Sequence, residues 1–139
     1  MAKGKDLEEA ERIYFICPVR NRTDEEKKLS DRYVRRLESQ GYMVHYPPRD
    51  VEQNDPTGGY NIMYIHRSAM EWCTQIRAYW NPTSSGSVGD ISMGFFARKP
   101  FKLANKRRIE EWLKSHPEIP KSHTHFAYVL DNLLSKEVK

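Results

Sequence analysis

The stretch Ile13-Tyr14-Phe15-Ile16-Cys17 is apolar at every position and stops at Pro18. A continuous apolar run closed by a proline predicts a strand that is buried on both faces, as strands of a parallel sheet are. Thr23-Asp24-Glu25-Glu26 follows as a capping box, in which the threonine caps a helix and the last glutamate reaches back to it. A strand, a polar loop and a helix in succession are the repeating unit of an α/β fold.

The same alternation continues outward along the chain. The helix after Thr23 is predicted to end at Gly41. Further strands are predicted at 42–46, 76–80 and, weakly, 101–103, and helices at 60–72 and 88–97. Right-handed crossovers between these elements would give a three-layer α/β sandwich around a parallel sheet of four to five strands, of the flavodoxin or Rossmann-like kind.

The 139 residues have the length of one domain, and we expect a single domain over 1–139. Within it, residues 1–11 are predicted to be a flexible N-terminal arm and residues 104–139 a helical C-terminal part, with a final amphipathic helix around 126–134. Hydrophobic residues make up 38% and charged residues 30% of the chain, which excludes an intrinsically disordered protein.

Several features predict a cytoplasmic protein without a membrane segment. The N-terminus is charged and lacks the apolar core of a signal peptide, and no stretch of 18 apolar residues occurs. Cys17 and Cys73 match no redox or metal spacing and are interpreted as free thiols. The histidines also lack ligand spacing, so no metal is expected.

The charge balance leaves the type of ligand open. Lysine and arginine number 23 against 19 acidic residues, a net charge of +4, which suits a phosphorylated small molecule as well as a nucleic acid. The run Lys106-Arg107-Arg108 is interpreted as the solvated face of a helix, so nucleic-acid binding is not the expected function.

Three polar loops leave the carboxyl ends of the predicted strands, where ligands bind in open α/β sheets. They span residues 18–22, 47–59 and 81–87. The third leads through Ser84, Gly86 and Ser87 to Asp90, and hydroxyls and glycines before a helix can surround an anion, although Ser87 or a neighbour could equally serve as the helix cap. Asp90 is expected in the first turn of that helix, pointing into the same crevice. Arg20 in the first loop could clamp a phosphate or carboxylate, or be a solvated arginine.

These motifs together resemble a known family. The stretch 13–20, the loop carrying Asp50, and Ser84-x-Gly86-x-x-x-Asp90 followed by Lys99-Pro100 look like the nucleoside 2-deoxyribosyltransferases, including the small 2′-deoxynucleoside 5′-monophosphate N-hydrolases. The resemblance covers residues 12–103. It implies cleavage or transfer at the N-glycosidic bond of a nucleoside or nucleoside 5′-monophosphate by a carboxylate nucleophile, with no cofactor, in a homodimer or higher homo-oligomer.

The resemblance also assigns roles to individual residues. It places Asp90 as the nucleophile. The remaining matched positions are expected to contact the substrate: Tyr14, Arg20, Ser84 and Gly86. Ser87 of the same loop is a further candidate substrate-binding residue.

Two departures from the family pattern matter. Asp90 stands where the family has a glutamate, and the family's second acid falls near His66. His66 could act as the general acid, since imidazole is the side chain that titrates near neutrality, or Asp50 or Asp55 of the long loop could take that role. Asp55 is also a candidate substrate-binding residue. The departures favour, as the alternative function, a nucleotide-binding sensor of the same fold with little or no catalysis.

Overall fold

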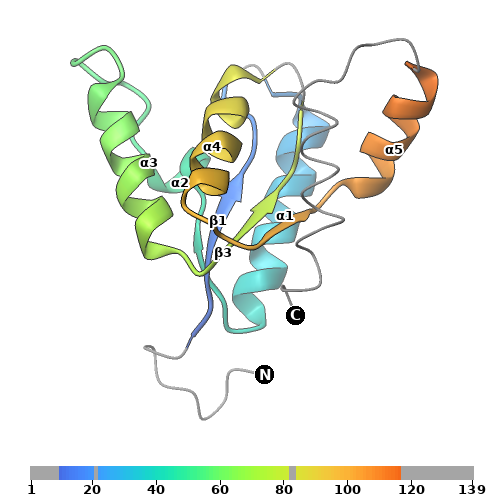
Figure 1. Ribbon diagram of the computed structural model, residues 1–139, viewed down its shortest axis with the longest axis horizontal. Helices are drawn as coiled ribbons and strands as arrows, with labels where there is room; N and C mark the ends of the chain where they lie inside the picture. The colour runs from blue at the N-terminus through green and yellow to red at the C-terminus, as the bar shows by residue number, and fades with distance from the viewer. Residues whose placement is uncertain (1–9, 21, 82–83, 117–139) are drawn as a thin grey trace.

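The computed structural model describes residues 10–20, 22–81 and 84–116 as a parallel sheet with helices on both faces (Figure 1). The strands are β1 (Arg12–Ile16), β2 (Met43–His45), β3 (Gln75–Ala78) and β4 (Phe101–Leu103). The helices in these ranges are α1 (Asp24–Ser39), α2 (Pro47–Asp50), α3 (Tyr60–Trp72), α4 (Ser85–Phe96) and α5 (Lys106–Ser115). The strand order is β2-β1-β3-β4, and every neighbouring pair is parallel.

Strand β1 lies inside the sheet, which explains why its sequence is apolar throughout. Ile13 pairs with Val44 of β2 on one side and with Gln75 of β3 on the other. All residues from Ile13 to Ile16 are completely buried. The prediction of a strand buried on both faces is therefore confirmed.

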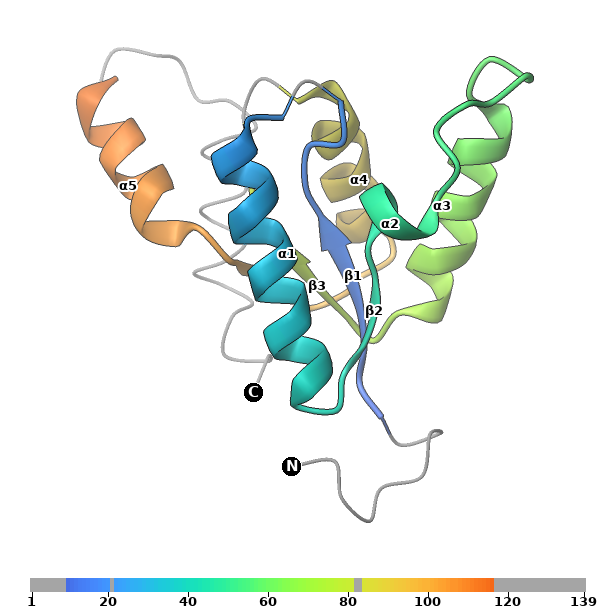
Figure 2. The same cartoon turned by 180° about the vertical axis from the view of Figure 1, so that it is seen from behind.

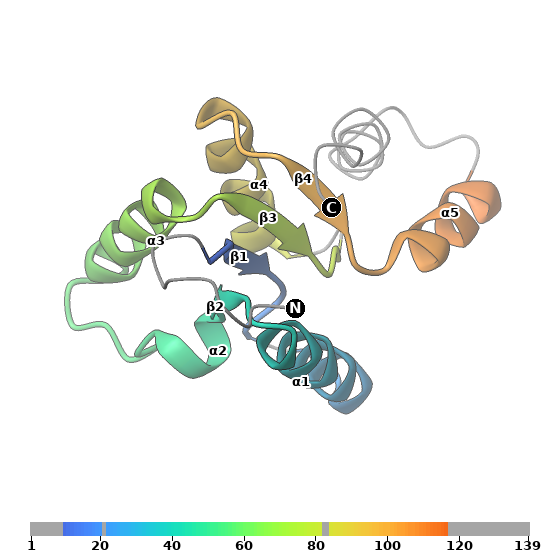
Figure 3. The same cartoon turned by 90° about the horizontal axis from the view of Figure 1, so that it is seen from below.

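The two faces of the sheet have separate cores, and Figure 3 shows α1 on one side with α3 and α4 on the other. Alternate residues of β1 enter different cores, as the period of a strand requires. Ile13 and Phe15 pack with α1, whereas Tyr14 and Ile16 pack with the side of α3 and α4. After β1 the chain turns to α1 on one face of the sheet, and after β3 it turns to α4 on the other face. Where two neighbouring strands lead to opposite faces, a crevice opens beyond their carboxyl ends.

The predicted capping box at the start of α1 is present. The Glu26 backbone N–H donates to Thr23 Oγ1 at 3.0 Å, and the Thr23 N–H donates to Glu26 Oε1 at 3.0 Å. The helix ends at a Gln40 cap, and Gly41 follows with a φ of 96°, in the left-handed region that glycine adopts without strain.

Helix α4 begins three residues before the predicted start, at Ser85. The cause is the cap: the side chain of Ser84 accepts from the Ser87 backbone N–H and satisfies it. Asp90 consequently lies in the second turn of α4, and the prediction of a first-turn position was wrong. Gly94 lets α4 approach β3 closely, because a Cβ there would lie 2.2 Å from Ile76 Cδ1.

The long polar loop after β2 contains a short helix that the sequence analysis missed. Helix α2 has Pro47 at its first position, where the fixed φ of proline is favourable, and Figure 2 shows it directly after β2. Helix α3 and strand β4 have the predicted bounds, whereas the other strands differ from the predicted ones by one or two residues at their ends. The predicted helix at 126–134 and residues 1–9 of the predicted arm lie outside the described residues. Among the described helices, none combines the length and the apolar character needed to cross a membrane.

Candidate active site

A cavity of about 650 Å³ opens beyond the carboxyl ends of β1 and β3. Its walls come from the loop after β1 at 17–20, the loop after α2 at Gln53, one face of α3 and the first turns of α4. All three polar loops identified in the sequence therefore contribute to one cavity, as their positions after parallel strands predict.

Asp90 is held in this cavity by groups from two other elements. It is 7% exposed and lies on α4. Its Oδ2 accepts a hydrogen bond from the Tyr14 hydroxyl on β1 at 3.1 Å, and its Oδ1 lies 3.3 Å from His66 Nδ1 on α3. The predicted nucleophile, a predicted substrate-contacting residue and a predicted proton donor are thus one connected group.

Tyr14 is a fixed donor to the carboxylate. Its side chain is fully buried, and burial together with the nearby charge of Asp90 raises the pKa of the Tyr14 hydroxyl far above its ordinary value. The hydroxyl therefore keeps its proton and donates a hydrogen bond to Asp90 at any physiological pH. Tyr14 does not itself line the cavity; it is buried behind the carboxylate of Asp90.

A second histidine, which the sequence analysis did not identify, packs behind the first. The ring of His45 lies 5.0 Å from the ring of Tyr14 and 6.3 Å from that of His66. Burial, and secondly the neighbouring His66, lower the pKa of His45. His45 is consequently neutral at neutral pH. The Nε2 atoms of both histidines are buried and have no hydrogen-bond partner within the described residues.

The N-terminus of α4 forms the polar end of the cavity. Ser84 and Gly86 line it, and the backbone N–H groups of the first helical turn are the unsatisfied donors that bind anions. Ser87 is 1% exposed, and its hydroxyl lies 2.9 Å from Ser84 Oγ, so it supports the cap and does not line the cavity. The capping interpretation is therefore correct for Ser84.

Arg20 lies at the rim of the same cavity. It is exposed, and its Nη2 donates to the Gln53 backbone carbonyl at 3.2 Å, which joins the loop after β1 to the loop after α2. No carboxylate pairs with it in the part of the chain that the structure describes. Its charge is available to an anionic ligand.

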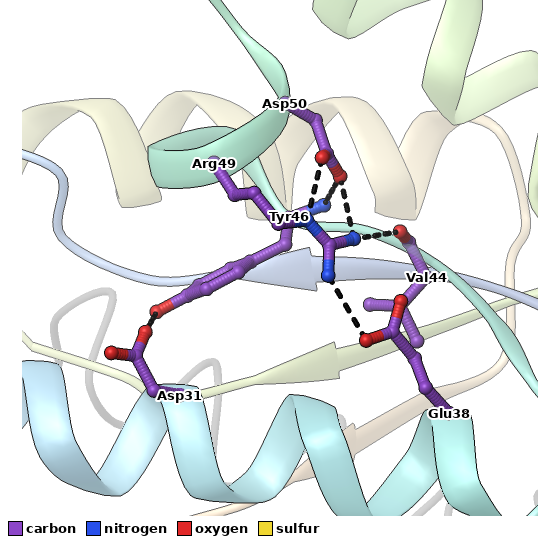
Figure 4. A network of polar contacts seen from close by, with 6 residues as sticks. All are labelled: Asp31, Glu38, Val44, Tyr46, Arg49 and Asp50. Atoms are coloured by element: carbon purple, nitrogen blue, oxygen red, sulfur yellow. Dashed lines mark hydrogen bonds and ion pairs between the residues drawn. The ribbon is translucent and has the colours of Figure 1, made fainter.

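Asp50 is placed elsewhere, in a network at the free edge of β2 (Figure 4). Arg49 donates to its Oδ1 at 2.7 Å, and the Tyr46 backbone N–H donates to its Oδ2 at 2.8 Å. Arg49 also donates to Glu38 at 2.9 Å and to the Val44 carbonyl at 3.1 Å. Although burial alone would raise the pKa of Asp50, the hydrogen bonds from Arg49 and Tyr46 lower it.

The Arg49 network covers the edge of β2 and lines a separate, open groove of about 720 Å³. Asp50 is not a lining residue of the Asp90 cavity. Of the three predicted proton donors, His66 is the one that the structure brings to Asp90.

Asp55 organises the start of α3 and does not line the cavity. Its Oδ1 accepts from the Thr57 N–H at 2.8 Å, and its Oδ2 accepts from the Ile62 N–H at 3.0 Å. The hydrogen bond from the Thr57 hydroxyl is the main cause of a lowered pKa at Asp55. These contacts describe a local turn, and a substrate-binding role for Asp55 has no support in this geometry.

Some lining residues were not predicted. Ile62 precedes His66 by four residues, so both occupy one face of α3, and helical spacing could have identified it. Gln53 follows no pattern in the sequence. Cys17, at the end of β1, also lines the cavity, and burial raises the pKa of its thiol to about 12. In residues 10–20, 22–81 and 84–116, no group of three or more acidic, histidine or cysteine side chains could hold a metal ion.

Comparisons with known proteins agree with this architecture. The chain is similar in structure to a 2-deoxyribosyltransferase from the psychrotolerant bacterium Bacillus psychrosaccharolyticus, with a TM-score of 0.57 and 17% sequence identity. The superposition covers 66% of this chain and 70% of that enzyme. No protein-family model and no curated protein sequence matches the chain. At this identity, the similarity establishes a shared α/β fold.

Proposed function

We propose that the chain cleaves or transfers at the N-glycosidic bond of a nucleoside or nucleoside 5′-monophosphate, with Asp90 as the nucleophile. The observation that carries the proposal is a buried carboxylate in a cavity of substrate size, oriented from one side by Tyr14 and from the other by His66. The structural similarity to a 2-deoxyribosyltransferase supports the same reaction class.

In the proposed reaction, an Asp90 oxygen attacks C1′ of the sugar. The bond from C1′ to the base nitrogen breaks, and its electron pair leaves with the base. The product is a glycosyl ester on Asp90 and a free base that has taken up one proton. Water then adds to C1′ and releases the sugar, or a second base adds and gives a new nucleoside.

His66 is the proposed source of the proton. A protonated His66 forms an ion pair with Asp90 across the 3.3 Å between Nδ1 and Oδ1. When Asp90 becomes an ester its negative charge disappears, so the proton on Nδ1 is no longer held there and can pass to the leaving base. The histidine takes a proton back from the attacking water in the second half of the reaction.

The polar end of the cavity is proposed to hold the sugar and a 5′-phosphate. Ser84, Gly86 and the free N–H groups at the start of α4 supply donors, and Arg20 supplies a positive charge across the opening. Ser87 contributes indirectly, by supporting the Ser84 cap.

A nucleotide-binding sensor is the second candidate. The observation in its favour is that both oxygens of Asp90 are engaged, on a side chain one methylene shorter than the glutamate of the family. A misplacement of about 1 Å can reduce a rate by roughly 100-fold, which would leave binding intact while turnover is lost.

The proposal includes a cytoplasmic location and a homo-oligomeric state. Two buried free thiols, Cys17 and Cys73, support a reducing compartment.

The proposal is tested by following base release by chromatography from a panel of ribo- and deoxynucleosides and their 5′-monophosphates. We expect release from at least one substrate by the native chain and by Asp50→Asn, and its loss in Asp90→Asn. Nucleotide binding in calorimetry without release over a day would favour the sensor. Release that survives Asp90→Asn would refute the assigned nucleophile.

A further inference from the structure

The two histidines of the candidate site each have one ring nitrogen without a partner. The Nε2 atoms of His45 and His66 are buried, and neither has a hydrogen-bond partner in residues 10–20, 22–81 and 84–116. Buried polar atoms are almost always hydrogen-bonded, either to protein or to an ordered water. Two such atoms on neighbouring rings of different segments, β2 and α3, point to one partner that serves both.

The distance between the two rings fits a bridging water. The ring centroids of His45 and His66 are 6.3 Å apart, with the ring planes at 78°. A direct hydrogen bond between two imidazole nitrogens needs centroids within roughly 5 Å, because the nitrogens themselves must come to about 3 Å. A water between the nitrogens spans the longer gap and is nearly as favourable in enthalpy. The ring of Tyr14 lies 5.0 Å from His45 and 6.1 Å from His66, so three rings meet at this position.

The proposed reaction needs a hydrogen-bond acceptor at His66 Nε2. Nδ1 of His66 lies 3.3 Å from Asp90 Oδ1, and it is the atom proposed to give a proton to the base and to take one back from water. The protonated ring carries an N–H on both nitrogens, and Asp90 serves the one at Nδ1. After Nδ1 has given up its proton, the other proton must stay on Nε2. The hydrogen bond made at Nε2 decides whether it does.

His45 can supply this acceptor because it is neutral. Burial is the largest cause of its lowered pKa, and the neighbouring His66 is the second. A neutral imidazole accepts a hydrogen bond at one nitrogen, whereas a protonated imidazole accepts at neither. Tyr14, the other ring beside His66, directs its hydroxyl to Asp90.

The charged groups around His45 do not keep a proton on it. Those that act on its pKa come from three neighbouring elements: His66 of α3, Asp90 of α4, and Arg49 and Asp50 of α2. Glu38 of α1 lines the same open groove as His45. Asp50 and Glu38 are both bound to Arg49, and Asp90 contacts His66, so each of these acids already has a basic partner.

We propose that His45 is a positioning residue for the proton donor: through one bridging water, its Nε2 accepts the hydrogen bond from His66 Nε2–H. This contact holds the His66 ring with Nδ1 toward Asp90 and keeps the second proton on Nε2 while Nδ1 gives and takes the other. A third group thereby orients the side chain that transfers the proton. His45 does not line the Asp90 cavity, so it acts through His66. The inference rests on the proposed function.

The first test compares two replacements of His45 in the steady-state kinetics of base release. His45→Leu removes the acceptor, so kcat should fall by about 10- to 100-fold, with KM nearly unchanged because His45 lies outside the cavity. Loss of the acceptor disfavours the protonated form of His66, so the decline of kcat with rising pH should begin about one pH unit lower. His45→Gln supplies an amide oxygen as acceptor and should restore both values.

Met43→Leu is the matched control, because Met43 is an exposed residue of the same strand, and this variant should have the native kcat and pH profile. A His45→Leu enzyme with the native kcat and pH profile would overturn the inference. Equal losses in His45→Leu and His45→Gln would also overturn it, by showing that the ring of His45 acts through its packing.

The second test does not depend on base release. Long-range proton–nitrogen NMR correlation spectra of the full chain report which ring nitrogen carries the proton. We expect His45 with its proton on Nδ1. At mildly acidic pH we expect a His66 Nε2–H that is protected from solvent exchange in the native chain and in His45→Gln, and unprotected in His45→Leu.

A native His45 with its proton on Nε2 would overturn the inference even in an enzyme that releases base. A chain that shows both expected signals but releases no base from any substrate would instead refute the proposed function, while the contact between the two histidines would be confirmed. The two failures are therefore distinguishable.

Discussion

Asp90 and Asp50 each follow a strand that pairs with β1, yet Asp90 is buried and Asp50 is exposed, and their surroundings differ in kind. Asp50 is neutralised by the guanidinium of Arg49, which stays charged at all accessible pH values and also contacts Glu38 and the edge of β2. Asp90 contacts a fixed hydrogen-bond donor, Tyr14, and a group that can exchange a proton, His66, and it faces a cavity. A carboxylate fixed by a permanent cation supports the fold, whereas a carboxylate that lies beside a cavity and contacts a proton-exchanging histidine is available for chemistry.

Neutralising Asp90 and Asp50 one at a time tests the difference between them most directly. Asp90→Asn should lower the rate of base release by about 10⁴-fold or more, because a covalent step loses its nucleophile. Asp50→Asn should leave the rate within about threefold, because Asp50 lies outside the cavity. Steady-state kinetics on both variants measure the contrast, and thermal unfolding confirms that each is folded. Equal losses in the two variants would remove the distinction.

The role of His66 predicts a smaller effect. His66→Gln keeps a side chain that can donate a hydrogen bond to Asp90 but cannot exchange a proton, so kcat should fall by about 10²- to 10³-fold. The pH dependence of kcat should change at the same time, because the side chain that supplies the proton is gone. The comparison variant is His45→Gln, which removes the neutral second histidine and should retain that dependence. A His66→Gln enzyme with an unchanged pH profile would contradict a proton-transfer role.

Tyr14 should contribute less than His66, since it orients the carboxylate without exchanging its proton. Tyr14→Phe removes one hydrogen bond to a charged group, which corresponds to a loss of about 10- to 100-fold in kcat/KM. The variant should bind substrate with little change in KM. Rapid kinetics of ester formation would check this, and a rate equal to that of the native chain would show that Tyr14 only fills space.

The smallest effect is expected from the Arg49 network at β2, which supports the fold and lies outside the Asp90 cavity. Arg49→Met should lower the free energy of unfolding by about 1 kcal/mol, because its contacts are partly exposed. The lowered pKa of Asp50 means that its contribution is present above the ordinary range near pH 4 and is lost as the pH falls through the folded value. Chemical denaturation at several pH values should therefore show a shallower acid decline in Arg49→Met. A decline as steep as in the native chain would count against this ion pair.

The sequence was sufficient for the parts of the fold that depend on local signals. The apolar run at Ile13, the capping box at Thr23 and the helix from Tyr60 to Trp72 were all predicted, because strand burial, capping and helical period leave a direct pattern. The start of α4 was predicted too late, since Ser84, Ser85 and Ser87 are all capable caps and the sequence does not rank them.

The arrangement of side chains in the candidate site was only partly predictable. That Asp90, His66 and Tyr14 come together followed from the family resemblance and the topology. The position of Asp50 outside the cavity could not be predicted in this way. Its partner Arg49 is held by Glu38, a residue of α1 that comes close only after folding. His45 was missed because its neighbour Tyr14 pairs with it across two strands. Contacts between distant segments produce no recognisable spacing pattern in the sequence.

The most direct test of Asp90 as the nucleophile is to trap the glycosyl ester. The chain is incubated with a 2-deoxy-2-fluoro nucleoside, whose fluorine slows breakdown of the ester, and is then digested and analysed by peptide mass spectrometry. The account predicts the mass of one fluorosugar on Asp90, with no adduct in Asp90→Asn and an unchanged adduct in Asp50→Asn. An adduct on any other residue, or base release from the natural substrate with inversion at C1′, would contradict it.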